Sequence, residues 1–315
     1  MVPKRPAPKV GGAPVRKRKA MFRNIVVGVD ELGSWHDALT LAKQLSADDA
    51  QLTVAHVTLF RPDIRLSRGY SVELDAEERA RDAQLLEEVR SEAGPGTQAQ
   101  WWRAPSIGRG LHELVDVLGA DLLVVGSSRR GLLGRVLLHD DTAAALNGAP
   151  CAIAIAPAGY AHQASAIKCI GVGYDGSPES EAAAALARGL AEDLKAELSG
   201  LQVVFHPAEL FVDPESPTLP ELVKHAEARV AALHDIQPLA VYGHPEEELA
   251  IYGESIDLLV IGSRGYGPIG RLIHGSTSSK LARTARCPLL VLTREARVSE
   301  ARPDGDQNAV AAHTT

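Results

Sequence analysis

The chain carries one pattern twice, and this repeat limits its fold more than any other feature of the sequence. The runs "NIVVGVD" (24–30) and "CIGVGYD" (169–175) are short and β-rich, end in an aspartate 145 residues apart, and each precede a segment of helical period. The next β-rich runs, "QLTVAHV" (51–57) and "ELSGLQV" (197–203), keep an offset of 146 residues. The later runs "DLLVV" and "DLLVI" are only 136 residues apart, so the first copy has ten more residues in its middle. We expect these ten residues in one connection.

Each copy alternates β-rich and helical runs, which predicts a parallel sheet covered by helices. Runs such as "DLLVV" and "PLLVL" are continuously apolar, as strands buried on both faces require. We therefore predict an α/β fold with two tandem open parallel five-stranded sheets flanked by helices, and we assume the strand order 3-2-1-4-5. The predicted domains are residues 22–158 and 166–295. In such sheets ligands bind beyond the carboxyl ends of the strands, where the strand order reverses.

Both ends of the chain are predicted to be disordered tails, residues 1–20 and 296–315. The first 20 residues hold seven Lys or Arg and no acid, among many Pro and Gly. This basic tail could contact nucleic acid or anionic lipid; the alternatives are a solvated extension or a true start at Met21. The remaining residues carry 26 basic against 40 acidic side chains, a net charge of −14, so the folded body is a poor nucleic-acid surface.

The composition also argues against several classes of protein. No apolar run reaches the ~18 residues of a membrane helix, and no signal peptide is evident, which predicts a soluble cytoplasmic protein. The three cysteines, Cys151, Cys169 and Cys287, lack paired spacing and are interpreted as core residues. The 11 histidines show no metal-ligand spacing, so no metal site is predicted, and His56 is expected to be packed or hydrogen-bonded.

Two further segments share a frame but differ in chemistry: "GSRGYGPIGRLIHGSTS" (262–278) and "GSSRRGLLGRVLLHDDT" (126–142). A loop that leaves a parallel strand and enters a helix presents backbone N–H groups and the positive end of a helix dipole, which suits phosphate. Glycines allow the backbone to approach closely. Helix capping is the alternative interpretation of the hydroxyls in the second of the two copies.

The spacing Gly262-x2-Gly265-x9-Gly275-Ser276, together with "YDGSPES" and "ARCPLLVL", resembles the ATP-binding branch of the universal stress protein family. The resemblance covers about residues 22–295. It implies an adenine-nucleotide α-hydrolase-like fold, ATP with or without Mg²⁺ as cofactor, and an internal pseudo-twofold dimer through "AIAIA" and "PLLVL". The positions that match the family's nucleotide contacts are Asp175 and Val203 for adenine and ribose, and Gly262, Gly265, Gly275, Ser276 and Thr277 for ribose and phosphates, with Arg264 as a phosphate neighbour.

The first copy departs from this pattern. It keeps Asp30, Val57 and Gly126 but carries Arg129, His139 and Asp140 where the second copy has Gly265, Gly275 and Ser276. A carboxylate ~4 to 5 Å from a phosphate charge costs roughly 3 to 4 kcal/mol at an effective dielectric constant near 20. ATP is therefore expected in the second copy only, while a different anion in the first stays open because Arg129 and Arg130 offset the acids.

The resemblance implies a nucleotide-responsive stress or dormancy regulator rather than an enzyme. Slow ATP hydrolysis or autophosphorylation stays open, with Asp175 the one nearby candidate base. The alternatives are a nucleotide-independent adapter for a protein partner and an ATP-dependent transferase; a homodimer also stays open. The run Gly265-x-Gly267-x2-Gly270 imitates a dinucleotide fingerprint, but Ser263 and Arg264 separate it from its strand, which argues against a dehydrogenase.

Overall fold

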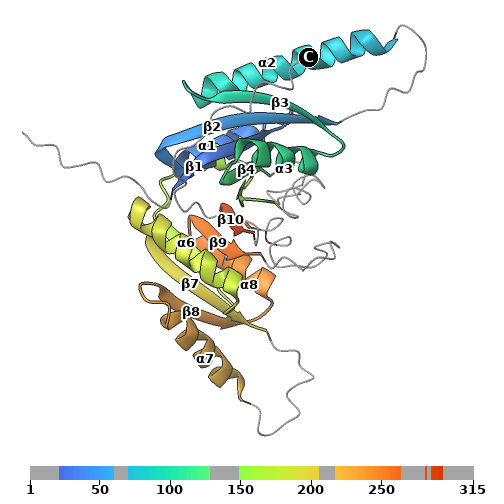
Figure 1. The fold of residues 1–315 in the computed structure, drawn as a ribbon. Coiled ribbons are helices and arrows are strands. Elements are labelled where there is room, and N and C mark those ends of the chain that lie inside the picture. Colours follow the sequence, from blue (N-terminus) through green and yellow to red (C-terminus); the bar gives the residue numbers. More distant parts are fainter. Residues whose placement is uncertain are drawn as a thin grey trace, which may run out of the picture.

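The structure, a computed structural model, describes residues 21–59, 70–127, 149–205, 217–263, 281 and 285–293. Its described strands form one ten-stranded sheet in the order β3-β2-β1-β4-β5-β10-β9-β6-β7-β8 (Figure 1). Both predicted tails lie outside the described residues, as does most of each glycine loop. No helix in the described part of the chain is both long and apolar enough to cross a membrane.

The two copies contribute matching sets of elements. Those of the first copy are β1 (Phe22–Val29), α1 (Trp35–Leu45), β2 (Ser46–Leu59), α2 (Tyr70–Ala93), β3 (Gln98–Ala104), α3 (Ile107–Leu118), β4 (Leu122–Gly126) and β5 (Ala152–Ala156). After the short helix α5 (Tyr160–Gln163), those of the second copy are β6 (Cys169–Gly173), α6 (Pro178–Leu194), β7 (Glu197–Val204), α7 (Leu219–Ala231), β8 (Gln237–Tyr242), α8 (Pro245–Tyr252), the 3₁₀ turn η2 (Gly253–Ser255), β9 (Leu258–Gly262) and β10 (Leu289–Leu292).

The strand order assumed for each copy is confirmed. The second copy continues the sheet with its strands in the reverse order, so the last strands of the two copies lie side by side at the centre. Strand β5 pairs with β10 antiparallel, Ala154 opposite Leu290, whereas the other described strand pairs are parallel. The expected pairing of the copies through their last strands is therefore confirmed. Thr293 of the second copy strengthens the junction, because its hydroxyl lies 2.9 Å from the Ala149 carbonyl oxygen and 3.0 Å from that of Cys151. The predicted two sheets are thus joined into one.

The extra residues of the first copy are divided between two connections, which corrects the expectation of a single one. Gln98 and Gln237 occupy the same place in their copies, because they pair with Thr53 and Ser199, which are 146 residues apart. Since Gln98 and Gln237 are 139 residues apart, seven of the ten extra residues lie between β2 and β3 and three between β3 and β4. The first seven lie in the connection that contains α2, which is longer than α7. The other three lie in the connection between β3 and β4, which contains α3.

Side chains alternate between the two faces of the sheet and fill two separate core layers. On β1, Ile25 and Val27 face one layer and Val26 faces the other. Helices α1, α2, α6 and α7 cover the first layer; α3 and α8 cover the second. Both layers contain residues of both copies, so burial of apolar side chains couples the halves.

An aspartate at the start of each fourth strand anchors the first strand of its copy. Asp121 accepts hydrogen bonds from the backbone N–H groups of Arg23 (2.9 Å) and Asn24 (3.0 Å). Asp257 does the same for Lys168 (2.8 Å) and Cys169 (2.9 Å). The aspartates of the repeated "DLL" runs therefore stabilise the strand ends.

The segment that joins the copies is held against α1. Asp37, fully buried in the first turn of that helix, accepts hydrogen bonds from the backbone N–H groups of Gly159 (2.8 Å) and Ala161 (2.7 Å). The Tyr160 hydroxyl also donates to Gln44 Oε1 at 2.5 Å. These contacts fix the path of the chain between the halves.

Asp37→Ala should lower the free energy of unfolding by about 2 kcal/mol, because it leaves two backbone N–H groups without their charged acceptor. Chemical denaturation measures this. Asp49→Ala, at an exposed position of β2, is the control and should change stability by less than about 0.5 kcal/mol. Equal stability of the two variants would show that the linker is not held by Asp37.

Candidate functional site

The strand order reverses between β6 and β9, and two of the predicted site residues lie at that point. The paired part of these strands ends at Gly173 and Ile261, so Asp175 lies just beyond β6 and Gly262 closes β9. Val203 lies two residues past Leu201, the last partner of β6, and thus borders the same edge. Arg264, Gly265, Gly275, Ser276 and Thr277 lie outside the described residues, and their roles stay predictions.

Gly262 has a packing role that it shares with Gly126. A β-carbon on Gly262 would lie closer than 3.0 Å to the backbone of Glu179, in the first turn of α6. A β-carbon on Gly126 would collide in the same way with Ser34, the residue before α1. Each glycine therefore lets a helix begin against the end of the fourth strand, whether or not a ligand is bound.

The aspartate after the first strand also has the same local role in both copies. Asp175 Oδ1 accepts hydrogen bonds from the Ser177 backbone N–H (2.9 Å) and hydroxyl (2.5 Å). Ser177 in turn caps α6, so residues 176–180 form a turn and the start of that helix. Asp30 Oδ1 accepts from the Ser34 backbone N–H at 3.0 Å. Asp175 is exposed, so this turn holds a carboxylate beside the strand ends where the strand order reverses.

The two copies differ in the charged side chains near the loop that follows the first strand of each copy. In the second copy, the Gln202 side-chain amide is best oriented with its nitrogen donating to the Ala226 carbonyl oxygen (3.3 Å). Its oxygen then accepts a hydrogen bond from Arg229 Nη2 (2.5 Å). Arg229 Nη1 also comes within 3.9 Å of the place where a β-carbon on Gly176 would lie. A guanidinium group of α7 thus lies beside the residue after Asp175, which the sequence analysis missed because Arg229 lies in a helix far along the chain.

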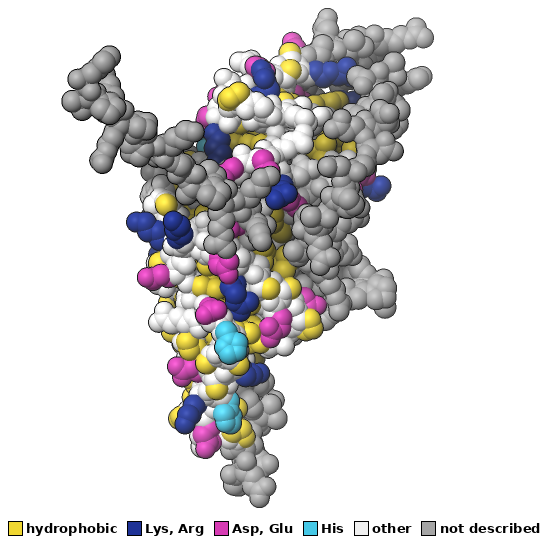
Figure 2. Space-filling model, turned by 60° about the vertical axis from the view of Figure 1, so that its left-hand side comes forward, with side chains coloured by type: hydrophobic (Ala, Val, Ile, Leu, Met, Phe, Trp, Pro, Cys, Tyr) yellow, Lys and Arg dark blue, Asp and Glu magenta, His cyan; other side chains and the backbone are white. Residues whose placement is uncertain are grey.

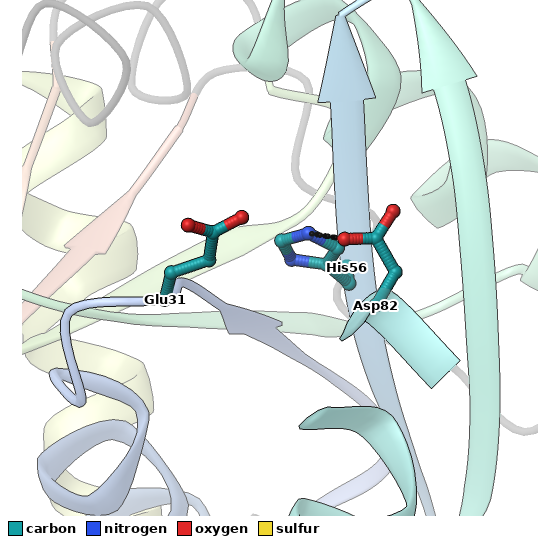
Figure 3. A group of neighbouring side chains, drawn as sticks. All are labelled: Glu31, His56 and Asp82. Carbon is teal, nitrogen blue, oxygen red and sulfur yellow. Dashed lines mark ion pairs between the residues drawn. The ribbon is translucent and has the colours of Figure 1, made fainter. Parts of the chain in front are cut away.

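In the first copy the same region holds an acidic group with a histidine (Figure 3). One ligand atom from each of Glu31, His56 and Asp82 lies within 4.8 Å of the others. They come from the loop after β1, from β2 and from α2. Sequence spacing could not reveal this group, because sheet pairing and helix packing bring together residues that are 25 or more positions apart.

The repeated fold has counterparts among known proteins. The family model described as "Universal stress protein family" matches residues 21–157 and, a second time, residues 166–293. The chain belongs to the universal stress protein family. A universal stress protein of Mycolicibacterium smegmatis is 28% identical over 289 residues, which are 85% of this chain and 96% of that protein.

Other universal stress proteins match single parts of the chain or the fold alone. One of Thermus aquaticus is 33% identical over 134 residues, 40% of this chain and 98% of that protein. For one of Mycobacterium tuberculosis, 30% identical over 190 residues, the chain covers only 61% of the relative. The crystal structure of a universal stress protein from Archaeoglobus fulgidus aligns with a TM-score of 0.62, covering 86% of this chain and 98% of that one, at 16% identity.

An aromatic pair lies at the same edge of the second universal stress domain. Phe205 follows β7, His244 precedes α8, and their ring centroids are 4.9 Å apart. The Phe205 side chain is half exposed. At the corresponding place, the first domain has Leu59, the last residue of β2.

Two of the three cysteines of this universal stress protein are core residues, as predicted, and the third, Cys169, is partly buried. Cys151 and Cys287 are buried before the last strand of each copy, and burial raises the pKa of both thiols to about 12. Cys169 lies in β6, where burial also raises its pKa. A thiol with a raised pKa stays protonated at neutral pH and is a poor nucleophile.

Proposed function

We propose that this universal stress protein binds one ATP per chain in the crevice of its second copy and acts in the cytoplasm as a nucleotide-responsive stress or dormancy regulator. The observation that carries the proposal is the meeting of Asp175 and Gly262 at the strand-order reversal. Gly262 is also the first residue of the G-x2-G-x9-G-S spacing. The glycine motif therefore leaves its strand at the place where open parallel sheets bind ligands.

Charge supports the second copy over the first. Its rim carries the Arg229 guanidinium, which suits an anion, whereas the corresponding rim of the first copy carries Glu31 and Asp82. On the face turned forward in Figure 2, the acidic and basic side chains of the described residues are interspersed. On this face, attraction for a polyanion would thus come from local groups and not from one large basic surface.

The residues near the strand-order reversal of the second copy can each make a specific contact with ATP in the proposed complex. The Asp175 carboxylate can accept hydrogen bonds from ribose hydroxyls, and the Val203 backbone would hydrogen-bond to adenine. The Phe205 and His244 rings, tilted by 43° to each other, add aromatic surface at the same edge. The predicted loop residues Arg264, Gly265, Gly275, Ser276 and Thr277 would surround the phosphates. Any Mg²⁺ would be bound largely through those phosphates, as is usual for this ion.

The runner-up is an adapter that serves a protein partner without nucleotide. It is favoured by the shared roles of Gly126 with Gly262 and of Asp30 with Asp175, because packing and helix capping alone account for these four residues. Mass spectrometry of the purified protein separates the two functions. Retained adenine nucleotide supports the regulator, while a nucleotide-free protein that also fails to take up added ATP supports the adapter.

Gly275→Asp should weaken ATP binding at least tenfold, about 1.4 kcal/mol, because it places a side chain and a negative charge at the expected phosphate approach. Isothermal titration calorimetry measures the change. His139→Ala, at the corresponding position of the first copy, is the matched control and should leave the affinity unchanged. Normal binding by the Gly275→Asp protein would contradict the assignment of the loop.

A further inference from the structure

The group formed by Glu31, His56 and Asp82 has the features of a metal site whose ligands are already oriented. His56 and Asp82 are each about 6% exposed, while Glu31 is exposed to solvent. Figure 3 shows the imidazole ring between the two carboxylates. Burying an imidazole and a carboxylate costs folding free energy unless a partner balances their charges.

The backbone fixes which nitrogen of His56 is available. Nδ1 lies 2.9 Å from the Val29 carbonyl oxygen, which can only accept a hydrogen bond, so Nδ1 carries the ring proton. Nε2 makes no hydrogen bond within the described residues, although Asp82 Oδ1 lies 3.3 Å away. With a proton on Nδ1, the Nε2 atom of the neutral tautomer presents its lone pair toward Asp82 Oδ1. A metal-binding histidine is commonly held by such a bond from its other nitrogen to a backbone carbonyl.

Asp82 is held in place by a second interaction of the same kind. Its Oδ2 accepts a hydrogen bond from Trp101 Nε1 at 3.0 Å, which leaves Oδ1 toward His56. Trp101 lies opposite His56 in the β2–β3 ladder, so the sheet itself aligns the two supporting contacts. An open pocket lined by Arg79, Asp82 and Trp101, among other residues, adjoins the group and connects it with solvent.

The distance between the two buried ligand atoms indicates the type of metal. With metal–nitrogen and metal–oxygen bonds of about 2.1 Å, ligands on a tetrahedral ion are about 3.4 Å apart, whereas adjacent ligands on an octahedral ion are about 3.0 Å apart. The observed 3.3 Å between Nε2 and Oδ1 fits the tetrahedral value. One imidazole and two carboxylates are ligands that Zn²⁺ accepts.

The second copy lacks three parts of this arrangement at the matching positions. The strand pairing places Gln202 at the position of His56 and Ala240 at that of Trp101. The 145-residue offset places Gly176 at the position of Glu31. The group is thus specific to the copy whose glycine motif has been lost, and it does not follow from the fold alone.

We propose that the first copy of this protein binds a tetrahedral divalent cation of the zinc type through His56 Nε2, Asp82 Oδ1 and the Glu31 carboxylate, with water in the fourth position. Val29 and Trp101 orient the buried ligands, and the exposed Glu31 closes on the ion. The site does not depend on nucleotide in the second copy.

The test uses the full chain, freed of metal by dialysis against a chelator and kept free of nucleotide. Titration with Zn²⁺ in a calorimeter should give one site per chain that depends on His56. His56→Gln, which introduces the residue of the second copy, should weaken that site at least about a hundredfold, and the positioning variant Trp101→Phe should weaken it about tenfold. His225→Gln, at an exposed position of α7, is the control and should bind normally.

Two further measurements keep the outcome clear. Glu31→Gln changes an exposed side chain, so it should fold normally and still lose at least about tenfold in affinity. Co²⁺ should give the intense visible absorption of tetrahedral coordination in the native chain and lose it in His56→Gln. The proposal would be overturned by any of three results: a Zn²⁺ affinity unchanged in both His56→Gln and Glu31→Gln, weak octahedral Co²⁺ bands, or no stoichiometric site. Each of them would leave only an ion pair between the histidine and the aspartate.

Discussion

Leu290→Asp is expected to destabilise both halves of the molecule together, by more than about 4 kcal/mol. Leu290 is fully buried in β10 and lies between Ala154 of β5 and Val260 of β9. A carboxylate there has no polar partner among the described neighbours, and the core layer to which it belongs contains residues of both copies.

Tryptophan fluorescence is a sharp readout for this variant, because all three tryptophans lie in the first copy and the substitution lies in the second. The denaturation midpoint reported by Trp35, Trp101 and Trp102 should therefore fall. Ile251→Asp, at a position of α8 that is 62% exposed, is the control and should leave the midpoint nearly unchanged. An unaltered fluorescence transition in the Leu290→Asp protein would show that the copies unfold independently.

Gly262→Ala should cost about 3 kcal/mol of folding free energy, because the added methyl group meets the backbone of Glu179 and the start of α6 must move. Gly126→Ala should cost a similar amount, since its methyl group meets Ser34. The two variants together test whether this glycine is kept for packing in both copies.

Gly28→Ala is the matched control, because the nearest atom to its β-carbon is the side chain of Val125 at 3.2 Å and not a backbone. It should cost less than about 1 kcal/mol. Chemical denaturation of the three variants compares them directly. If Gly262→Ala were as stable as the native chain but failed to bind ATP, the glycine would serve the ligand alone.

The repeated order of β-rich and helical runs was enough to predict a parallel sheet covered by helices in each half, while the strand order 3-2-1-4-5 was assumed and is now confirmed. Alternation limits the topology strongly, because parallel strands need crossover helices and buried strands read as continuous apolar runs such as "DLLVV". The antiparallel pairing of β5 and β10 followed from the family resemblance, and the structure confirms it.

Other features depend on contacts that the sequence does not encode locally. The division of the extra residues became visible only when Gln98 and Gln237 were matched through their strand partners. The role of Gly262 depends on where α6 begins, and the Arg229 and His56 environments depend on how helices pack over strand ends. Spacing along the chain cannot reveal groups that form only through packing.

Isothermal titration calorimetry of the full chain with ATP tests the central claim most directly, because it counts sites as well as measuring affinity. The asymmetry between the Arg229 rim and the acidic rim at Glu31 and Asp82 predicts one ATP per chain, bound in the second copy. Two equivalent sites per chain, or no binding at all, would contradict it.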